Sequence, residues 1–509
     1  MLLQLYKNGI IIISNHDLVN RNLIFKQRGD YMFIGRESEL QFLEDRYNRT
    51  DGQLIVLYGR RRIGKTETLR KFCEGKSHVF YSCKECDDRL QLKSFSEKIL
   101  KENLPAGKYI TEFSDWEKAL ASVTELPYNG KKLLIIDEFP YMCKGNQGIP
   151  SILQALWDEV LKNSNVMIIL CGSSMSFIEK ELLSEKNPLY GRATGIYRMR
   201  EMSFKEASLF FPDYSPKDKI LAYAILGGIP HYLNQFNPSV SLEDNIKQNI
   251  LAKGCILYSE VEFLLKQELR ETALYNSLIE AVALGSTKLN EISQKSLMED
   301  TSKTSVYLRN LIELGIIERE FSVNAGTKEK ANTNRGLYRL TDNYFRFWYA
   351  FVFPNHTELE LNDVEGIYQY AIAPKLHEFA SLTFEDVCRE YLRNLQKEGR
   401  LPFRFTRMGR WFGKTTVRDA DSVKVAETEI DIVAVSESPK SLLIGECKFK
   451  GHPFTYSDFL DTFAKLTPQK ADNKFYYALF SESGFDEKVI QTAQAEKNIY
   501  LFSLDDIVN

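Results

Sequence analysis

The sequence predicts an α/β protein built on a parallel sheet, and three observations lead to this fold class. An apolar run at residues 54–58 leads through a glycine-containing loop into a helix pattern. A second apolar run, at residues 133–136, ends in two adjacent carboxylates, and a third, at residues 166–171, leads into polar residues. Apolar runs that alternate with helix patterns are typical of buried parallel strands, whose carboxyl ends gather polar side chains at one edge.

The chain of 509 residues is too long for a single core, and its patterns divide it into five segments. Residues 1–31 carry no strong pattern, and we expect them to lie outside the fold because MFIGRESEL, which begins at Met32, has the character of a natural start. The expected segments after this extension are a strand-and-helix core at 32–200, a helical lid at 201–270, a helix-turn-helix unit at 271–344 and a final α/β domain at 345–509.

Composition and charge indicate an ordinary cytoplasmic protein. The net charge of −3 does not indicate nucleic-acid binding by the whole chain, so any such binding needs a local patch. No apolar run approaches the roughly 18 residues of a membrane span, and we expect no membrane partner. Among the eight cysteines, Cys83 and Cys86 form a CxxC pair without a second pair at zinc spacing, which favours ordinary thiols over a metal site.

The loop at residues 59–66, GRRRIGKT, fits the phosphate-binding template GxxxxGK(S/T) at every fixed position. Its two glycines allow backbone N–H groups to turn inward around an anion, and the helix that opens near Lys65 adds its positive end. Lys65 is expected to reach the β- and γ-phosphates of ATP, and Thr66 to offer its hydroxyl to Mg²⁺. The expected nucleotide-binding residues here are Gly59, Arg60, Arg61, Arg62, Ile63, Gly64, Lys65, Thr66 and Glu67.

Two adjacent carboxylates, Asp137 and Glu138, end the buried strand at residues 133–136. Carboxylates at such a position need a cation, and Mg²⁺ fits because the phosphate loop follows another strand of the same sheet. Asp137 is expected to hold the metal through water, and Glu138 to orient and activate the attacking water. Ser173 and Ser174 follow the next buried strand, where a sensor of the γ-phosphate is expected.

Arg192 lies in a glycine-flanked turn, NPLYGRATG. A cation there can stabilise transition-state charge, in its own subunit or in a neighbouring one. The second arrangement requires a homo-oligomer. A surface arginine without a role in the reaction is the equally weighted alternative.

These residues together resemble the prokaryotic AAA-type ATPases related to the signal-transducing STAND class. The resemblance rests on FIGRESEL, GRRRIGKT, LLIIDEFPYM, the CGSS strand end, PLYGR and GGIPHYL. It implies a P-loop NTPase parallel sheet with a helical lid, with GGIPHYL near the base or the sensor region. GGIPHYL contains His231 but no arginine to serve as the second sensor of a ring motor, and this departure favours a nucleotide-controlled switch.

A compact unit follows the lid. Residues 287–296 and 300–314 are predicted helices, and IIEREFSV and RGLYRLTD are predicted strands around a polar loop. The unit resembles a winged helix-turn-helix that binds DNA. Several glutamates dilute its positive face, so a winged helix that binds protein is the open alternative. The implied DNA contacts are Lys303, Thr304, Tyr307 and Arg309 on the second helix and Lys328, Lys330 and Arg335 on the wing.

The last domain contains a second chemical signal, TEIDIVAVSESPKSLLIGECKFK at residues 428–450. Its alternation predicts a hairpin, and a turn centred in SESPK places Asp431 opposite Glu446. Opposed side chains lie about 4.5–5.5 Å apart at Cβ, so these carboxylates repel unless a cation lies between them. Lys448, two residues after Glu446, points to the same face.

Two carboxylates and a lysine suit metal-assisted cleavage of a phosphodiester. The arrangement is similar to the PD-(D/E)XK nuclease superfamily, with EID as the first acid and ECK as the second acid and the lysine. The resemblance implies an α/β restriction-endonuclease-like domain in which Asp431 and Glu446 hold the metal and Glu385, on the preceding helix, is an extra acidic residue. The basic segment GRWFGK is expected to touch a phosphate backbone. A solvated charged hairpin is the alternative, since the pattern is loose.

The whole chain resembles a prokaryotic family that joins an AAA-type ATPase, a winged helix and a nuclease-like domain. We expect Mg²⁺-dependent ATP hydrolysis coupled to DNA binding or cleavage. The competing hypothesis is a regulatory switch, in which ATP turnover controls a surface that binds a protein or DNA partner and the nuclease fold is inactive.

Overall fold

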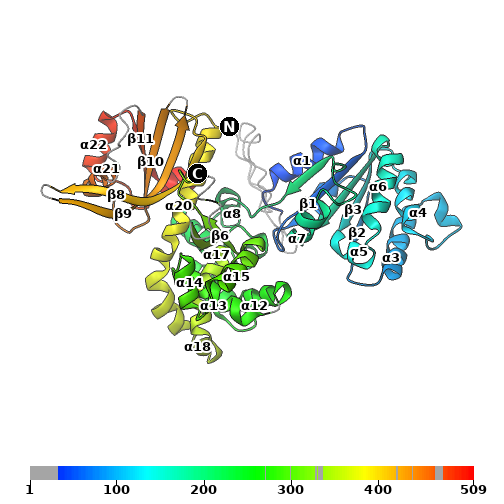
Figure 1. The fold of residues 1–509 in the computed structure, drawn as a ribbon, viewed down its shortest axis with the longest axis horizontal. Coiled ribbons are helices and arrows are strands. Elements are labelled where there is room, and N and C mark those ends of the chain that lie inside the picture. Colours follow the sequence, from blue (N-terminus) through cyan, green and yellow to red (C-terminus); the bar gives the residue numbers. More distant parts are fainter. Residues whose placement is uncertain are drawn as a thin grey trace, which may run out of the picture. The chain divides into compact units, whose positions relative to one another are not determined.

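The computed structural model describes residues 33–269, 271–298, 300–326, 330, 336–419, 422–437, 440–464 and 474–508. The expected extension at 1–31 lies outside these residues, as do Lys328 and Arg335 of the expected wing. Two five-stranded sheets, separated in the sequence by a largely helical segment, form the main elements of the described chain (Figure 1).

The first sheet confirms the predicted parallel α/β core (Figure 1). Its strand order is β2-β3-β4-β1-β5, and all neighbouring strands are parallel. Strands β1 and β4 are buried along their whole length, which explains their continuous apolar sequences. Because β4 lies between β1 and β3, the polar residues that follow these three strands meet at one edge. The strands are β1 (Gln53–Tyr58), β2 (His78–Ser82), β3 (Lys132–Asp137), β4 (Val166–Gly172) and β5 (Gly195–Arg198).

Helices cover both faces of this sheet. Alternate residues of β1 enter two different cores, Ile55 and Leu57 on one face and Leu54 and Val56 on the other. Helices α1 (Glu37–Tyr47) and α2 (Lys65–Cys73) pack against the first of these faces. The second face is covered by α3 (Asp88–Leu100), α4 (Trp116–Ala121), α5 (Phe139–Gly145) and α6 (Ile149–Glu159), and a short α7 (Met175–Phe177) follows β4.

A continuous hydrophobic core extends from Met202 to Ile507. It includes residues of the helical segment, of a small two-stranded sheet and of the C-terminal sheet. The helical segment comprises α8 (Phe204–Ser208), α9 (Pro216–Leu226), α10 (Pro230–Leu233), α11 (Leu242–Ile246), α12 (Ile256–Glu268), α13 (Thr272–Ala283), α14 (Leu289–Lys295) and α15 (Thr301–Glu313). Antiparallel strands β6 (Ile317–Glu320) and β7 (Leu337–Leu340) follow it.

Helix α15 has clear start and stop signals. The side chain of Asp300 accepts a hydrogen bond from Ser302 N at its start, and Gly315, with φ +70, follows its last turn. The expectation that Thr304 contacts DNA is wrong, because this side chain is fully buried and its hydroxyl bonds to Ser293 Oγ at 3.0 Å.

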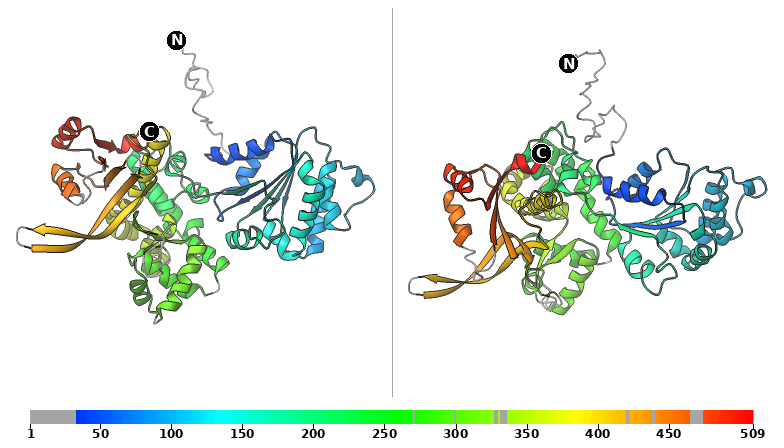
Figure 2. Two further views of the ribbon diagram at one scale, coloured as in Figure 1. Left: turned by 45° about the horizontal axis from the view of Figure 1, so that its top comes forward. Right: turned by 90° about the horizontal axis from the view of Figure 1, so that it is seen from above.

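The second five-stranded sheet is mixed, with the strand order β12-β11-β10-β9-β8. Strands β8 to β10 pair antiparallel, and β10 to β12 pair parallel. The β9–β10 pairing runs from Glu437–Lys440 to Ile432–Gly445, which is the predicted register. Figure 2 shows β8 and β9 continuing as a two-stranded ribbon beyond the rest of the sheet. The strands are β8 (Arg407–Asp419), β9 (Ser422–Glu437), β10 (Lys440–Lys448), β11 (Lys474–Ser481) and β12 (Ile499–Ser503).

The long helix α20 (Ala373–Lys397) contacts α9 of the helical segment and also strands β9 and β10. Its buried residues Phe384 and Val387 belong to the shared core. Within the described ranges, none of the helices has the length and apolar character needed to cross a membrane. The remaining helices are α17 (Asn343–Phe347), α18 (His356–Glu360), α19 (Val364–Gly366), α21 (Tyr456–Ala464), α22 (Glu487–Ala495) and α23 (Leu504–Val508).

Gly228, between α9 and α10, packs directly against the backbone of Met202. Met202 N donates to Gly228 O at 2.7 Å, and a Cβ at Gly228 would lie 1.9 Å from Met202 O. We expect Gly228→Ala to lower the free energy of unfolding by about 1–3 kcal/mol, seen as a lower melting temperature. Gly451→Ala is the control, since a Cβ at Gly451 meets no atom within 4 Å. Equal melting temperatures for the two variants would contradict the tight contact.

Candidate functional site

The loop between β1 and α2 forms a concave backbone surface. Gly59 has no room for a side chain, because a Cβ there would lie 2.4 Å from Met199 O. Gly64 adopts φ +88 at the N-cap of α2. The N-cap residue supplies no side-chain cap to this helix end, so its first N–H groups remain available to an anion at the positive end of the helix dipole.

Lys65 directs its ammonium group into this concave surface. Its side chain is buried, and Nζ donates to Gly59 O and Arg60 O, both at 2.9 Å. Burial lowers the pKa of Lys65 from its ordinary value. Among the described residues, the hydrogen-bond partners of this ammonium group are two neutral carbonyl oxygens, and charged phosphate oxygens would be stronger partners.

Thr66 and Asp137 form a hydroxyl–carboxylate pair across the sheet. Thr66 Oγ1 donates to Asp137 Oδ2 at 2.8 Å, and Asp137 is 4% exposed at the carboxyl end of β3. Mg²⁺ is commonly bound by one or two protein oxygens together with substrate phosphates and water. This pair therefore fits Mg²⁺ beside a bound nucleotide, with Thr66 as the hydroxyl ligand and Asp137 as the carboxylate.

Glu138 lies next to Ser173, which follows the neighbouring strand β4. Ser173 Oγ donates to Glu138 Oε1 at 2.8 Å and lies 2.9 Å from Oε2. Glu138 has φ +51, and this left-handed turn directs the chain from β3 into α5. Both residues line a cavity of about 770 Å³ together with Arg61, Tyr141 and Glu268. The Glu138 carboxylate therefore lies at the wall of this cavity.

Two arginines of the loop form buried ion pairs with downstream segments. Arg60 Nη1 lies 2.7 Å from Oδ2 of Asp342, which is 1% exposed, and the Arg60 guanidinium lies over the ring of Phe345. Arg62 pairs with Glu260 on α12, which is also 1% exposed. Removing one partner of a buried pair costs about 3–5 kcal/mol, so both arginines anchor the loop.

Arg61 forms a different kind of pair. Its Nε lies 2.9 Å from Glu268 Oε1 at the end of α12, and both side chains are more than one-third exposed. An exposed pair of this kind contributes about 0–1 kcal/mol. Arg61 is therefore the arginine of the three that separates from its acid at little cost.

Two segments outside the motif support the loop. Arg36, in the GRESEL turn, is 2% exposed and donates from Nη2 to Ile63 O at 2.6 Å. Pro230 of GGIPHYL packs at Gly64, where a Cβ would lie 3.7 Å from Pro230 Cγ. His231 follows, and burial lowers its pKa from the ordinary value, with the Arg62 charge adding to the shift. The role of Arg36 was not predicted from the sequence, where the available signal is the Gly35-Arg36 pair directly before the first helix pattern.

The other residues expected at this site are placed differently. Arg192 forms a two-point contact with Asp158, at 2.8 Å and 3.0 Å, and donates to Pro188 O at 2.9 Å. Glu67 is exposed and pairs with Arg70 at 2.7 Å on the surface of α2. A role of Arg192 in the reaction stays a prediction.

The predicted acidic residues of the C-terminal hairpin lie on the adjacent strands β9 and β10. Lys448 Nζ lies 3.1 Å from Oε1 of the buried Glu446, and Asp431 Oδ2 accepts from Cys447 N at 2.8 Å. Burial by itself lowers the pKa of Lys448. The carboxylates of Glu446 and Asp431 raise it, and the pKa lies above the ordinary value. In the part of the chain that the structure describes, no group of three His, Cys, Asp or Glu residues is arranged to hold a metal ion.

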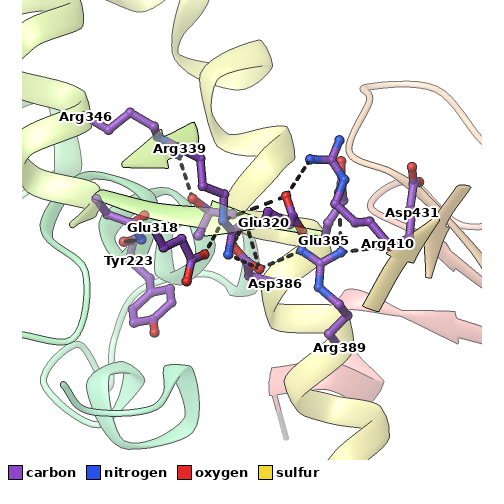
Figure 3. Close-up of polar contacts among 12 residues, drawn as sticks. Tyr223, Glu318, Glu320, Arg339, Arg346, Glu385, Asp386, Arg389, Arg410 and Asp431 are labelled. Atoms are coloured by element: carbon purple, nitrogen blue, oxygen red, sulfur yellow. Dashed lines mark hydrogen bonds and ion pairs between the residues drawn. The ribbon is translucent and has the colours of Figure 1, made fainter. Parts of the chain in front are cut away.

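Glu385 on α20 is the fourth predicted member and is surrounded by arginines (Figure 3). Its Oε2 lies 3.4 Å from Arg410 Nε and 3.6 Å from Arg389 Nη1. Burial raises the pKa of Glu385 to about 8, and the nearby Asp431 charge adds to this effect. The two arginines act in the opposite direction, because they favour the ionised carboxylate.

Arg410 belongs to an ion-pair network that the sequence did not reveal. Arg410 Nη1 lies 3.2 Å from Glu320 Oε2 on β6 (Figure 3). Its Nη2 pairs with Glu429. Arg339 and Arg389 extend it through Asp386. The expectation that GRWFGK contacts a phosphate backbone is wrong for Arg410, because its guanidinium already pairs with three carboxylates.

Comparisons with known proteins support an ATPase domain. Residues 33–236 match a family described as an ATPase domain predominantly from Archaea, and residues 348–458 match archaeal and bacterial proteins of unknown function. The uncharacterized protein MJECL04 of Methanocaldococcus jannaschii is 33% identical over 420 residues, which cover 82% of this chain and 88% of that protein. The uncharacterized ATP-binding protein MJ0423 of the same organism is 52% identical over 48 residues, 9% of this chain and 81% of that protein.

Two solved structures also match part of this chain. A Walker-type ATPase of Pyrococcus abyssi is 17% identical and has a TM-score of 0.45, covering 62% of this chain and 96% of that one. The ORC2 protein of Aeropyrum pernix, in ADPNP–ADP complexes, is 14% identical with a TM-score of 0.39, covering 66% and 94%.

Arg410 provides a test of the C-terminal network. Arg410→Ala leaves the carboxylates of Glu320 and Glu385 without this partner in a mostly buried site, and we expect it to lower the free energy of unfolding by about 3 kcal/mol. Arg407→Ala is the matched control, because Arg407 lies on the same strand, is 49% exposed and pairs only with the exposed Glu437 among the described residues. Equal losses on thermal unfolding would contradict the structural role of Arg410.

Proposed function

Because the chain belongs to the family of ATPases, predominantly archaeal, in which a region of unknown function follows the ATPase domain, we propose that it couples Mg²⁺-dependent ATP hydrolysis to DNA binding or cleavage by its C-terminal part. The observation that carries the ATPase half is the convergence of Lys65, the Thr66–Asp137 pair and the Glu138–Ser173 pair at one sheet edge.

Each of these residues has a distinct role in the proposed reaction. Lys65 exchanges the carbonyls of Gly59 and Arg60 for oxygens of the β- and γ-phosphates. Thr66 and Asp137 hold Mg²⁺, which neutralises the phosphate charge during the reaction. Glu138 orients the attacking water and accepts its proton, and Ser173 links the Glu138 carboxylate to the γ-phosphate position.

The DNA-binding half rests on the unit formed by α13, α14, α15 and the β6–β7 pair. We propose that this unit is a winged helix, with the exposed residues Lys303 and Arg309 on α15 and Lys330 in the segment between β6 and β7 as the DNA contacts. Tyr307, which the sequence also suggested as a DNA contact, is not included because its hydroxyl donates to Glu271. The DNA-binding proposal rests on these exposed basic side chains.

The cleavage half rests on Asp431, Glu446 and Lys448. A helix before the hairpin, a mixed sheet and two helices beside later strands suit a nuclease-like fold, and we propose Asp431 and Glu446 as metal ligands with Lys448 orienting the water.

A second candidate function is a regulatory switch whose C-terminal domain does not cleave DNA. The observation that favours it is that Glu385, the extra acidic residue of the predicted nuclease pattern, is already paired with Arg389 and Arg410. In this alternative, ATP turnover changes a surface for a protein or DNA partner.

Two substitutions separate nucleotide binding from hydrolysis. We expect Lys65→Ala to abolish ATP binding in calorimetry, whereas Glu138→Gln keeps binding and lowers kcat by at least about 10², since the general base is removed. Lys71→Ala is the control, because Lys71 is an exposed residue of the same helix that pairs with Glu74. Wild-type kcat in Glu138→Gln would contradict the role of this carboxylate.

DNA cleavage is tested with linear, circular and single-stranded DNA, with Mg²⁺ or Mn²⁺, and with and without ATP. If Asp431 and Glu446 share one metal, Asp431→Asn, Glu446→Gln and the double variant should lose cleavage equally. Glu437→Gln, an exposed position on the same hairpin, should cleave like wild type. Stable wild-type protein that cleaves none of these DNAs would instead support the regulatory switch.

A further inference from the structure

The transition state of ATP hydrolysis needs a cation near the γ-phosphate in addition to Lys65 and Mg²⁺. Arg192, the residue expected from the sequence, is held by both carboxylate oxygens of Asp158 and by Pro188 O. In the described chain, the cations that line the cavity beside Glu138 are Arg61 and Lys144. Lys144 is 67% exposed and pairs with Glu85, so Arg61 is the better placed of the two.

The three arginines of the loop differ in their freedom to move. Arg60 and Arg62 each pair with an acid that is 1% exposed, and leaving either acid would strand a buried charge. Arg61 instead pairs with Glu268 in a solvent-exposed contact, where separation is nearly free. Arg61 also lines the same cavity as Glu138, the residue proposed to activate the attacking water.

We propose that Arg61 is a catalytic residue, the cation that stabilises the γ-phosphoryl transition state from within the same chain, and that Glu268 restrains it when the site is idle. This inference rests on the proposed ATP hydrolysis. During the reaction, a water oxygen forms a bond to the γ-phosphorus while Glu138 takes the water proton. The bond from that phosphorus to the bridging oxygen breaks, and its electron pair leaves with ADP. Arg61 changes no bond and donates hydrogen bonds to the γ-phosphoryl oxygens.

The position of Glu268 connects this restraint to the proposed winged helix. Glu268 is the last residue of α12, and it lines a cavity of about 480 Å³ together with Tyr307, Asn310 and Glu313 of α15. A ligand that shifts α15 therefore acts on the acid that holds Arg61. Turnover would rise when such a ligand draws Glu268 away from the guanidinium.

Kinetics of single and double variants test the inference. We expect Arg61→Ala to lower kcat by about 10²–10³ while the Kd for ATP changes by no more than about threefold, because the contact forms in the transition state. Glu268→Gln should raise kcat by up to about fivefold, since the charge that restrains Arg61 is lost. The double variant should match Arg61→Ala, because Glu268 acts through Arg61.

Arg400→Ala and Glu398→Gln are matched controls, because these residues form another exposed pair, at 3.1 Å, and both variants should keep wild-type kcat. Unchanged melting temperatures exclude misfolding as the cause of lost activity.

Wild-type kcat in Arg61→Ala would overturn the inference, as would a loss of ATP affinity as large as the loss of turnover. A gain from Glu268→Gln that persists in the double variant would overturn the restraint. Absence of ATP hydrolysis by the wild-type protein would refute the proposed function itself. This result is distinct from a failure of the Arg61 inference, in which the wild-type protein still hydrolyses ATP.

Discussion

The ion pair between Arg60 and Asp342 joins the phosphate loop to a residue that lies almost three hundred positions later in the chain. Asp342 is 1% exposed and also caps α17 by accepting from Phe345 N, so the same carboxylate orders the loop and a helix of the C-terminal part. With the pair between Arg62 and Glu260, it makes the shape of the nucleotide site depend on segments outside the ATPase sheet. If nucleotide binding moves the loop, these two ion pairs carry the movement to the helical segment.

The C-terminal cluster follows the same physical rule with a different outcome. Carboxylates that converge in a buried place need cations, and a metal ion or arginine can meet that need. Around Glu385 the described structure supplies Arg389 and Arg410, whereas Glu446 is paired with Lys448. The network through Arg410 also reaches Glu320 on β6, so an ion pair connects the β6–β7 strands to the C-terminal sheet.

Local rules made part of this site predictable from the sequence. The loop from Gly59 to Thr66 follows a fixed template, and the strand that ends at Asp137 is a continuous apolar run, so the pairing of Thr66 with Asp137 followed from parallel strands in one sheet. The period of two residues per strand gave the β9–β10 register. Local rules could not predict which acids pair with Arg60, Arg61 and Arg62. These acids lie about two hundred or more residues later in the chain, and no local sequence pattern connects such distant positions. The prediction for Thr304 was also wrong, because this polar residue was expected on the DNA-binding face of α15 and its side chain is buried in the core.

A structure with Mg²⁺ and a non-hydrolysable ATP analogue tests the central claim most directly. The claim is that the loop exchanges protein partners for phosphate partners when nucleotide binds. We expect Lys65 Nζ to leave Gly59 O and Arg60 O for the β- and γ-phosphates, Thr66 Oγ1 to turn from Asp137 to the metal, and Arg61 to separate from Glu268 and approach the γ-phosphate. A bound analogue that leaves Lys65 on the two carbonyls and Arg61 on Glu268 would contradict the account.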